Sequence, residues 1–316
     1  MNKFKSILKR HDGPLFQPAD FPFYVADQIF NPGQVMTPDG RTILILAVIP
    51  RASARPRCHV AESVDGIHFT IHEKPCFSTE NSAFPGYDDW AIDTRVTYFK
   101  EENCYYIIRP GTAGGPCALL YRTYDFNKFE PLEIIALPSN RVPCLFPEKI
   151  KGEYVRLDRP YSPGAPLGAE NGDIWLSRSP DMIYWGKHRQ VFKHDCTQWA
   201  AAKIGPTPPI KTGKGWLEIF HGVQSYGAGF RYSLGACLLD LENPEKVIGY
   251  MKSYLLTPET DYEYNGAVPN VVFSTGAVVE PQSRELRIYY GSADTCIGLA
   301  TGNVDEIVEM CLREGE

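Results

Sequence analysis

The chain has 316 residues, of which 43% are hydrophobic and 22% are charged, and these proportions are typical of a folded globular protein rather than a disordered one. A formal net charge of −6 weighs against a nucleic-acid partner, and no apolar stretch reaches membrane-spanning length, which weighs against a membrane protein. The 27 glycines, 26 prolines and 12% aromatic residues favour many strands and turns.

The first 29 residues form a lead-in ahead of the first predicted strand. Residues 1–13, MNKFKSILKRHDG, contain an apolar run of only two residues, too short for the core of a secretory signal. The nine cysteines form no CxxC pair, and Cys104, Cys144 and Cys237 lie in or beside apolar segments, where a reduced cysteine behaves as a small hydrophobe. These features predict a protein of the reducing cytoplasm.

The predicted strands come in five pairs, in which a shorter strand precedes a longer apolar one. The first members of the pairs are residues 31–36, 93–99, 146–150, 203–210 and 268–273. The second members are residues 42–51, 104–109, 153–159, 215–221 and 286–294.

A turn motif recurs along the chain with these pairs. Residues 63–69, 123–129 and 179–185 each contain Ser or Thr, one residue, Asp, three residues and an aromatic. An Asp in such a turn accepts hydrogen bonds from backbone amides two residues on. The aspartates, continued by Asp240 and Asp305, recur about every 60 residues.

Five strand-rich units of this size predict an all-β fold, a five-bladed β-propeller formed by residues 1–316 as one domain. A β-sandwich is the alternative, but it does not explain the period. Helix is predicted only at the C-terminus, where residues 304–314 place Val304, Ile307, Val308 and Cys311 on one face. This helix offers a surface through which a homo-oligomer could form.

The second strand of each pair ends on a polar residue, and equivalent positions of successive blades surround one axis. These strand ends are Arg51, Arg109, Arg159, His221 and Asp294. The other strands and the loop before the third blade add Asn31, Asp93, Lys149 or Glu148, Lys203 and Arg141. A solvated strand end is the simpler interpretation of each residue alone, but the set predicts one mouth that binds a polar ligand.

Four of these side chains suit a compact polyanion: Arg141, Arg159, Lys203 and His221. Guanidinium groups bind phosphate bidentately, lysine adds a point charge and histidine a further donor. The chain has no Walker pattern, and the glycine-rich residues 111–116 follow a strand without a helix after them. Free phosphate is therefore favoured over a nucleotide, and neither a metal site nor an organic cofactor is predicted.

Asp93 follows Trp90, Ala91 and Ile92 directly. Apolar neighbours favour the protonated form of a carboxyl group, which suits a general acid. The alternative is an ion pair with Arg95, two residues on and on the same face of the strand.

These residues resemble those of glycoside hydrolase family 130, the inverting β-mannoside phosphorylases, from about Phe30 to the C-terminus. The resemblance is strongest over residues 146–160, 179–189, 203–223, 255–273 and 289–295. It implies a five-bladed propeller, with Asp93 as catalytic acid and Arg141, Arg159, Lys203 and His221 around phosphate. Sugar contacts are expected from Asp294, Asn31 and Arg51, with Arg109 and Lys149 as further substrate-binding residues. One departure is Asp93-Thr94-Arg95, where the family usually has Asp-Pro-Arg.

The implied reaction is phosphorolysis of a β-mannosyl oligosaccharide to α-mannose 1-phosphate and a shortened acceptor. Phosphate is already an anionic nucleophile, so the second carboxylate that an inverting hydrolase needs as base is not required. Two alternatives stay open, a β-mannoside hydrolase of the same family and a non-catalytic carbohydrate-binding propeller. Loops 52–58, 77–90, 111–117 and 161–170 are expected to select linkage and acceptor.

Overall fold

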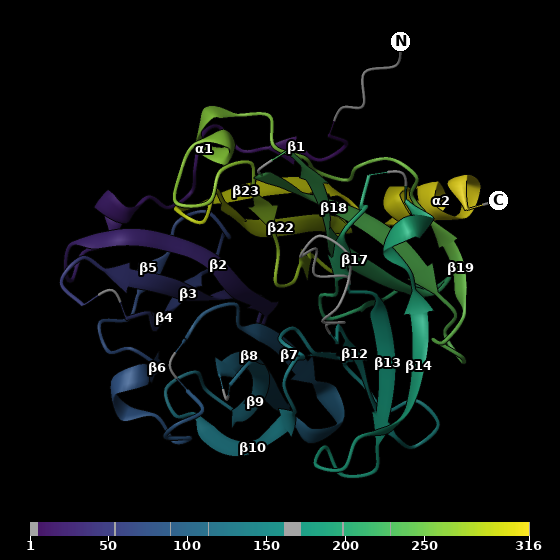
Figure 1. Cartoon of the computed structure of the whole chain (residues 1–316), viewed down its shortest axis with the longest axis horizontal. Helices are drawn as coiled ribbons and strands as arrows, with labels where there is room; N and C mark the ends of the chain where they lie inside the picture. The colour runs from purple at the N-terminus through teal and green to yellow at the C-terminus, as the bar shows by residue number, and fades with distance from the viewer. Residues whose placement is uncertain are drawn as a thin grey trace.

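Five antiparallel sheets arranged in a ring make up the fold, in the computed structural model shown in Figure 1. The structure describes residues 6–53, 55–88, 90–112, 114–160, 172–197, 199–227 and 229–315. The sheets are the blades of an all-β, five-bladed propeller, which confirms the predicted fold class.

Within each blade the main strands pair in chain order. Blade 1 contains β2 (Ala26–Met36), β3 (Thr42–Pro50), β4 (Arg57–Ser63), β5 (Thr70–Ile71) and β6 (Phe77–Ser78). Blade 2 contains β7 (Arg95–Phe99), β8 (Cys104–Thr112), β9 (Pro116–Thr123) and β10 (Glu130–Ala136). Blade 3 contains β11 (Cys144–Leu145), β12 (Tyr154–Asp158), β13 (Ile174–Ser179) and β14 (Gly186–Phe192).

The last two blades complete the ring. Blade 4 contains β15 (Lys203–Gly205), β16 (Ile210–Lys211), β17 (Trp216–Tyr226), β18 (Gly229–Leu239) and β19 (Val247–Tyr250). Blade 5 contains β20 (Val272–Phe273), β21 (Val278–Val279), β22 (Glu285–Ser292), β23 (Cys296–Asn303) and, from the N-terminus, β1 (Lys9–Arg10). The helices are α1 (Asp261–Tyr264) and α2 (Val304–Glu314), with 3-10 turns η1 (Pro18–Asp20), η2 (Thr79–Asn81), η3 (Lys100–Glu102) and η5 (His194–Cys196).

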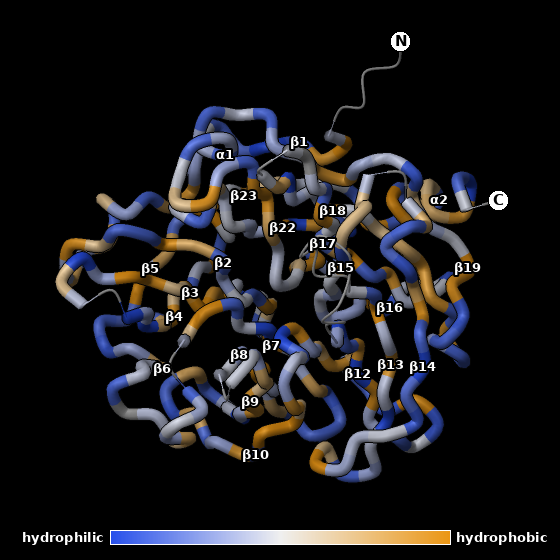
Figure 2. The backbone as a smooth tube through the Cα atoms, in the orientation of Figure 1, coloured by the Kyte–Doolittle hydropathy of each residue, from blue (hydrophilic) through white to orange (hydrophobic). Residues whose placement is uncertain are grey.

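The apolar strands are continuous runs because both of their faces are buried between neighbouring blades. In β3 every residue is buried; Ile43 and Ile45 pack in the cluster shared with blade 2, whereas Leu44 and Leu46 pack in the cluster shared with blade 5. This alternation follows from the two-residue period of a strand. Similar clusters fill the other interfaces between blades, and Figure 2 shows the hydrophobic colouring concentrated on the strands.

The predicted aspartate turns join the third and fourth strands of the first four blades. In each turn one carboxylate oxygen accepts hydrogen bonds from the backbone amides two and three residues on, at Asp65, Asp125, Asp181 and Asp240. Asp305 differs, because it lies in the first turn of α2, which the side chain of Asn303 caps. Blade 5 has no fourth strand after this position within the described chain and takes β1 instead.

The N-terminal strand closes the ring. Lys9 and Arg10 of β1 pair with Thr301 and Ala300 of β23, so the predicted lead-in supplies the outermost strand of the last blade. The Arg10 guanidinium also binds the buried carboxylate of Glu263, with Nε 2.8 Å from Oε1. A strand from the beginning of the chain thus holds the sheet formed by its end.

The C-terminal helix has the predicted boundaries and the predicted buried face. Val304, Ile307, Val308 and Cys311 are buried in the cluster between blades 4 and 5. The apolar face of α2 is therefore covered within the chain rather than presented to a second copy. In the described part of the chain, neither this helix nor the shorter α1, which was not predicted, has the length and apolar character needed to cross a membrane.

Two strands extend beyond their predicted ends. β8 continues to Thr112 and β17 to Tyr226, because each forms a long hairpin with the strand that follows it. Arg109 and His221 therefore lie within strands, and the prediction that both are strand ends was wrong.

Candidate active site

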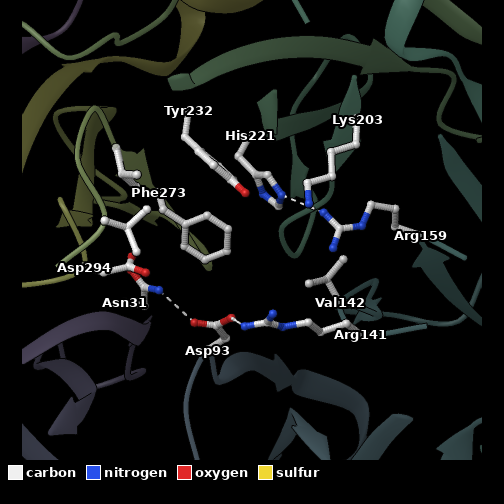
Figure 3. A pocket seen from close by; sticks show the side chains of 12 residues that line it. Asn31, Asp93, Arg141, Val142, Arg159, Lys203, His221, Tyr232, Phe273 and Asp294 are labelled. Atoms are coloured by element: carbon white, nitrogen blue, oxygen red, sulfur yellow. Dashed lines mark hydrogen bonds and ion pairs between the residues drawn. The ribbon is translucent and has the colours of Figure 1, made fainter. Parts of the chain in front are cut away.

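Seven of the ten predicted site residues line one cavity of about 160 Å³. They are Asn31, Asp93, Arg141, Arg159, Lys203, His221 and Asp294. The remaining lining residues are Val142, Tyr232, Val268, Val271 and Phe273. Figure 3 shows the carboxyl groups of Asp93 and Asp294 on one side and the guanidinium of Arg159 and the amine of Lys203 on the other.

The Asp93 carboxylate is buried and held from two sides. Its Oδ1 accepts a hydrogen bond from Asn31 Nδ2 at 2.8 Å, and its Oδ2 accepts one from Arg141 Nη2 at 2.9 Å. Arg95 Nη1 donates instead to the backbone carbonyl of Asp93, at 2.8 Å. The partners of this carboxylate are thus two other residues of the cavity, and the alternative ion pair with Arg95 is replaced by a bond to the main chain.

Three acidic or amide residues of the cavity share an uncommon backbone conformation. Asn31, Asp93 and Asp294 have φ angles of 40°, 50° and 49°, in the left-handed region that few non-glycine residues adopt. They come from blade 1, from the start of blade 2 and from the β22–β23 turn of blade 5. Such conformations persist where the surrounding structure enforces them, and they concentrate at functional sites.

The second carboxyl group of the cavity is Asp294. Burial, and then the nearby Asp93 carboxylate, raise the pKa of Asp294 to about 7. A group with this pKa changes its protonation state near neutral pH, so it can either donate or accept a hydrogen bond from a bound polar ligand.

The basic side of the cavity joins blades 3 and 4. Arg159 Nη1 lies 2.9 Å from His221 Nε2, and because a guanidinium can only donate, the histidine nitrogen accepts. Burial and then the charge of Arg159 lower the pKa of His221 well below its ordinary value. His221 is therefore a neutral ring with its proton on Nδ1, an atom without a hydrogen-bond partner among the described residues.

Two glycines make room for these side chains. A Cβ atom at Gly205 would lie 2.2 Å from His221 Cε1 and 3.0 Å from Arg159 Nη1. A Cβ atom at Gly291 would lie 1.8 Å from Asn31 Oδ1. Real Cβ atoms do not approach other atoms this closely, so both positions need glycine.

Arg109 does not line the cavity, contrary to the prediction that it lies at the common mouth. Its guanidinium is buried against the carboxylate of Asp88, with Nη1 2.7 Å from Oδ1, and packs on the rings of Phe77 and Tyr121. A buried arginine needs a carboxylate partner, and this one finds it in the core between blades 1 and 2.

Arg51 and Lys149 also lie away from the cavity, contrary to prediction. The Arg51 side chain is 68% exposed and pairs with Asp27 at 2.7 Å, because β3 runs past the level of the cavity before it ends. Lys149 lies near the turn of the β11–β12 hairpin, at the end opposite Arg141 and Arg159, with Nζ 4.3 Å from the centre of the Tyr154 ring.

Sequence reasoning missed two aromatic residues of the cavity. The Phe273 and Tyr232 rings lie 4.5 and 6.2 Å from the His221 ring, centre to centre, and Lys203 Nζ lies 6.0 Å from the Tyr232 centre. Tyr232 comes from the second strand of the long β17–β18 hairpin, whose length was not predicted. Phe273 is the last residue of a predicted strand, and other lining residues were predicted because they end strands.

Thr94, the departure from the family pattern, has a definite role in packing. It is buried, and its Oγ1 accepts a hydrogen bond from the backbone amide of Gly33 at 3.1 Å. Proline could not provide this acceptor. The hydroxyl thus ties β2, which carries Asn31, to the segment that carries Asp93.

The cavity can bind a ligand that is polar and neutral at one end and anionic at the other. The donors of Arg159, Lys203 and His221 suit the anion, and the two aspartates suit hydroxyl groups. The described residues include no group of three or more His, Cys, Asp or Glu side chains suited to a metal ion. Of the four loops expected to select the acceptor, residues 161–170 lie outside the described residues, as do residues 54, 89 and 113 within the other three.

Comparison with known proteins gives one consistent family. The model of glycoside hydrolase family 130, described as beta-1,4-mannooligosaccharide phosphorylase, matches residues 6–313. The beta-1,4-mannooligosaccharide phosphorylase of Ruminococcus albus is 38% identical over 79% of this chain and 75% of its own. The beta-1,2-mannobiose phosphorylase of Listeria innocua is 36% identical over 79% of this chain and 67% of its own. A structure of beta-1,2-mannobiose phosphorylase from Listeria innocua with beta-1,2-mannobiose has a TM-score of 0.85 at 28% identity, and covers 98% of this chain and 100% of that one.

Proposed function

Because this chain belongs to glycoside hydrolase family 130, we propose that it is an inverting β-mannoside phosphorylase. The enzyme cleaves a β-mannosyl oligosaccharide with inorganic phosphate and releases α-mannose 1-phosphate and a shortened acceptor. The observation that carries this proposal is the pairing, within one cavity, of a buried carboxylate at Asp93 with a basic cluster at Arg159, Lys203 and His221.

Phosphate binds at the basic side, below the mannosyl ring. Arg159 and Lys203 supply positive charge, and His221, which is neutral, supplies a hydrogen-bond donor from Nδ1. Arg141, whose guanidinium lies beside the Asp93 carboxylate, completes the set. Holding the anion in line with C1 supplies orientation and charge neutralisation, which account for much of the catalysis in reactions of this kind.

Asp93 acts as the general acid. One phosphate oxygen forms a bond to C1 as the bond from C1 to the leaving oxygen breaks. The 3-hydroxyl of the mannosyl unit gives its proton to the leaving oxygen and receives the proton of Asp93, which acts in its carboxylic acid form. Asn31 and Arg141 hold the carboxyl group from either side. Asp294 binds the mannosyl hydroxyls, which places the sugar between the acid and the anion.

An assay with and without phosphate tests this proposal. The purified protein is incubated with β-1,4-mannobiose, β-1,4-mannotriose and β-1,2-mannobiose, and the products are separated. We expect mannose 1-phosphate only when phosphate is present. Free mannose formed without phosphate would identify a hydrolase, and no product from any substrate would identify a sugar-binding propeller. The relatives act on both linkages by name, so the better substrate assigns the linkage.

The remaining parts of the proposal concern its surroundings. Phosphate is the co-substrate, and neither a metal nor an organic cofactor takes part, so EDTA should leave the rate unchanged. All nine cysteines are free thiols, which supports a reducing cytoplasmic location.

A further inference from the structure

Two arginines of the proposed phosphate site come from segments separated by a whole hairpin. Arg141 precedes β11 and Arg159 follows β12, so both lie at the open end of the β11–β12 pair. Their side chains are long, and their separation depends on how firmly the two backbones are joined. The residue before each of them, Asn140 and Asp158, joins these backbones.

Asn140 bridges the two segments with both ends of its amide. Its Nδ2 donates to Asp158 Oδ1 at 2.8 Å, and its Oδ1 accepts from the backbone amide of Arg159 at 3.2 Å. The backbone of Asn140 also forms a β-bridge with Pro160, and its backbone N–H donates to the carbonyl of Pro116 in blade 2 at 2.9 Å. One side chain therefore contacts Arg159 directly and adjoins Arg141 in sequence.

The acceptor in this pair is itself immobilised. Asp158 is 3% exposed, and its carboxylate also accepts from Arg156 Nε, 2.9 Å from Oδ1, and from the hydroxyl of Ser177. Arg156 Nη1 in turn donates to the carbonyl of Ile135 in blade 2, at 2.6 Å. Asp158, Arg156 and Ser177 are buried, where hydrogen bonds are strong, so this network can hold the half-buried Asn140 at a fixed place.

We propose that Asn140 and Asp158 are positioning residues, which set the distance between Arg141 and Arg159 for phosphate. The inference rests on the proposed function. The alternative is that the network only fastens blade 2 to blade 3. The two differ in what is lost, because a misplacement of about 1 Å at a reacting group costs roughly 10²-fold in rate, whereas a weaker blade interface lowers stability alone.

Kinetics on Asn140→Ala separate these roles. We expect the KM for phosphate to rise by about 10- to 100-fold, with the KM for the mannoside changed less than about threefold. Phosphate affinity measured by calorimetry should fall by the same factor, a readout that does not need turnover. The matched control is Leu176→Ala, a fully buried residue of the same blade in the cluster with blade 4. It should lower the unfolding temperature without altering the phosphate KM.

A charge exchange provides the second test. Asn140→Asp places two carboxylates against each other and should weaken phosphate binding most. In the double variant with Asp158→Asn, the amide at position 158 donates and the carboxylate at position 140 accepts. This exchange should recover part of the lost phosphate affinity, which would show that the two residues are coupled. If folded Asn140→Ala keeps the wild-type phosphate KM, or if Leu176→Ala raises it equally, the inference is overturned. A wild-type protein that releases no mannose 1-phosphate would instead overturn the proposed function, and calorimetry would still test the effect of Asn140 on phosphate.

Discussion

At the scale of single residues, the cavity separates two kinds of chemistry. The carboxyl groups of Asp93 and Asp294 are buried where Asn31 and Arg141 can bind them. On the basic side of the cavity, Arg159 and Lys203 surround a neutral histidine. Burial acts on both sides by disfavouring charge, which raises the pKa of Asp294 and lowers that of His221. The environments of the residues, rather than their types, therefore set their roles.

Asp93→Asn keeps the shape of the side chain and removes its proton. General-acid catalysis typically contributes 10²- to 10⁴-fold, so we expect kcat for phosphorolysis to fall by about this factor. Initial rates of mannose 1-phosphate release at saturating phosphate measure it. A folded variant with a rate near that of the wild type would place the acid elsewhere.

His221→Ala removes one uncharged donor from the proposed anion site. A hydrogen bond to a charged group contributes roughly 1.5–3 kcal/mol, which corresponds to a rise of about 10- to 150-fold in the phosphate KM. Because the pKa of His221 lies well below its ordinary value, the ratio of variant to wild-type KM should be the same at pH 6 and pH 8. Arg51→Ala, which removes a cation outside the cavity, is the control and should leave phosphate dependence unchanged. A ratio that grew toward pH 6 would show that the histidine binds as a cation.

At the scale of elements, the blades are joined by apolar clusters and the ring is closed by a two-residue strand. β1 is too short to hold its place by pairing alone, and the Arg10 guanidinium adds contacts to Glu263, to Glu259 and to the carbonyl of Thr257. The closing strand thus depends on a buried ion pair that reaches the segment around α1.

Arg10→Ala should destabilise the protein by about 3 kcal/mol, because it leaves the Glu263 carboxylate, which is 0% exposed, without its cation. Urea unfolding at neutral pH, followed by circular dichroism, measures the change. The control is Arg41→Ala, whose half-exposed partners on blade 1 predict a loss of no more than about 1 kcal/mol. Equal losses of unfolding free energy in the two variants would show that the buried contact of Arg10 stabilises the protein no more than an exposed ion pair does.

At the scale of the whole molecule, the cavity connects all the blades, because its lining comes from every one of them or from the segments between them. Protonation of a cavity residue therefore affects the unfolding free energy of the whole propeller. Asp294, with a pKa raised to about 7, keeps its proton in the folded state over a pH range where the unfolded chain has lost it. Burial of the Asp294 carboxyl group therefore lowers the unfolding free energy increasingly as the pH rises toward 7.

The unfolding free energy of the wild type should therefore fall between pH 4 and pH 7, relative to that of Asp294→Asn, and the difference should be constant above pH 8. Each pKa unit corresponds to 1.36 kcal/mol, so a shift from 3.8 to about 7 predicts a change on the order of 4 kcal/mol. His221 acts in the opposite direction, since its lowered pKa reduces stability as the pH falls below 6.5, but it does so equally in both proteins. Parallel curves for the two proteins from pH 4 to pH 8 would contradict the assigned shift.

Local patterns, together with their recurrence about every 60 residues, were enough to predict the blades, the turns of the first four blades and the C-terminal helix. The aspartate turns, the alternation within β3 and the apolar face of α2 each involve residues only a few positions apart, so the sequence by itself determined them. The positions of Asp93, Arg159 and Asp294 at one cavity were predicted from the recurrence of the blades around one axis and from the resemblance to the family. Only the tertiary structure decided the place of β1, the length of the β17–β18 hairpin and the direction of Arg109, because each depends on a partner distant in sequence or on strand register. A buried guanidinium lies where its carboxylate lies, and no local pattern indicates that Asp88, rather than a ligand, would meet Arg109.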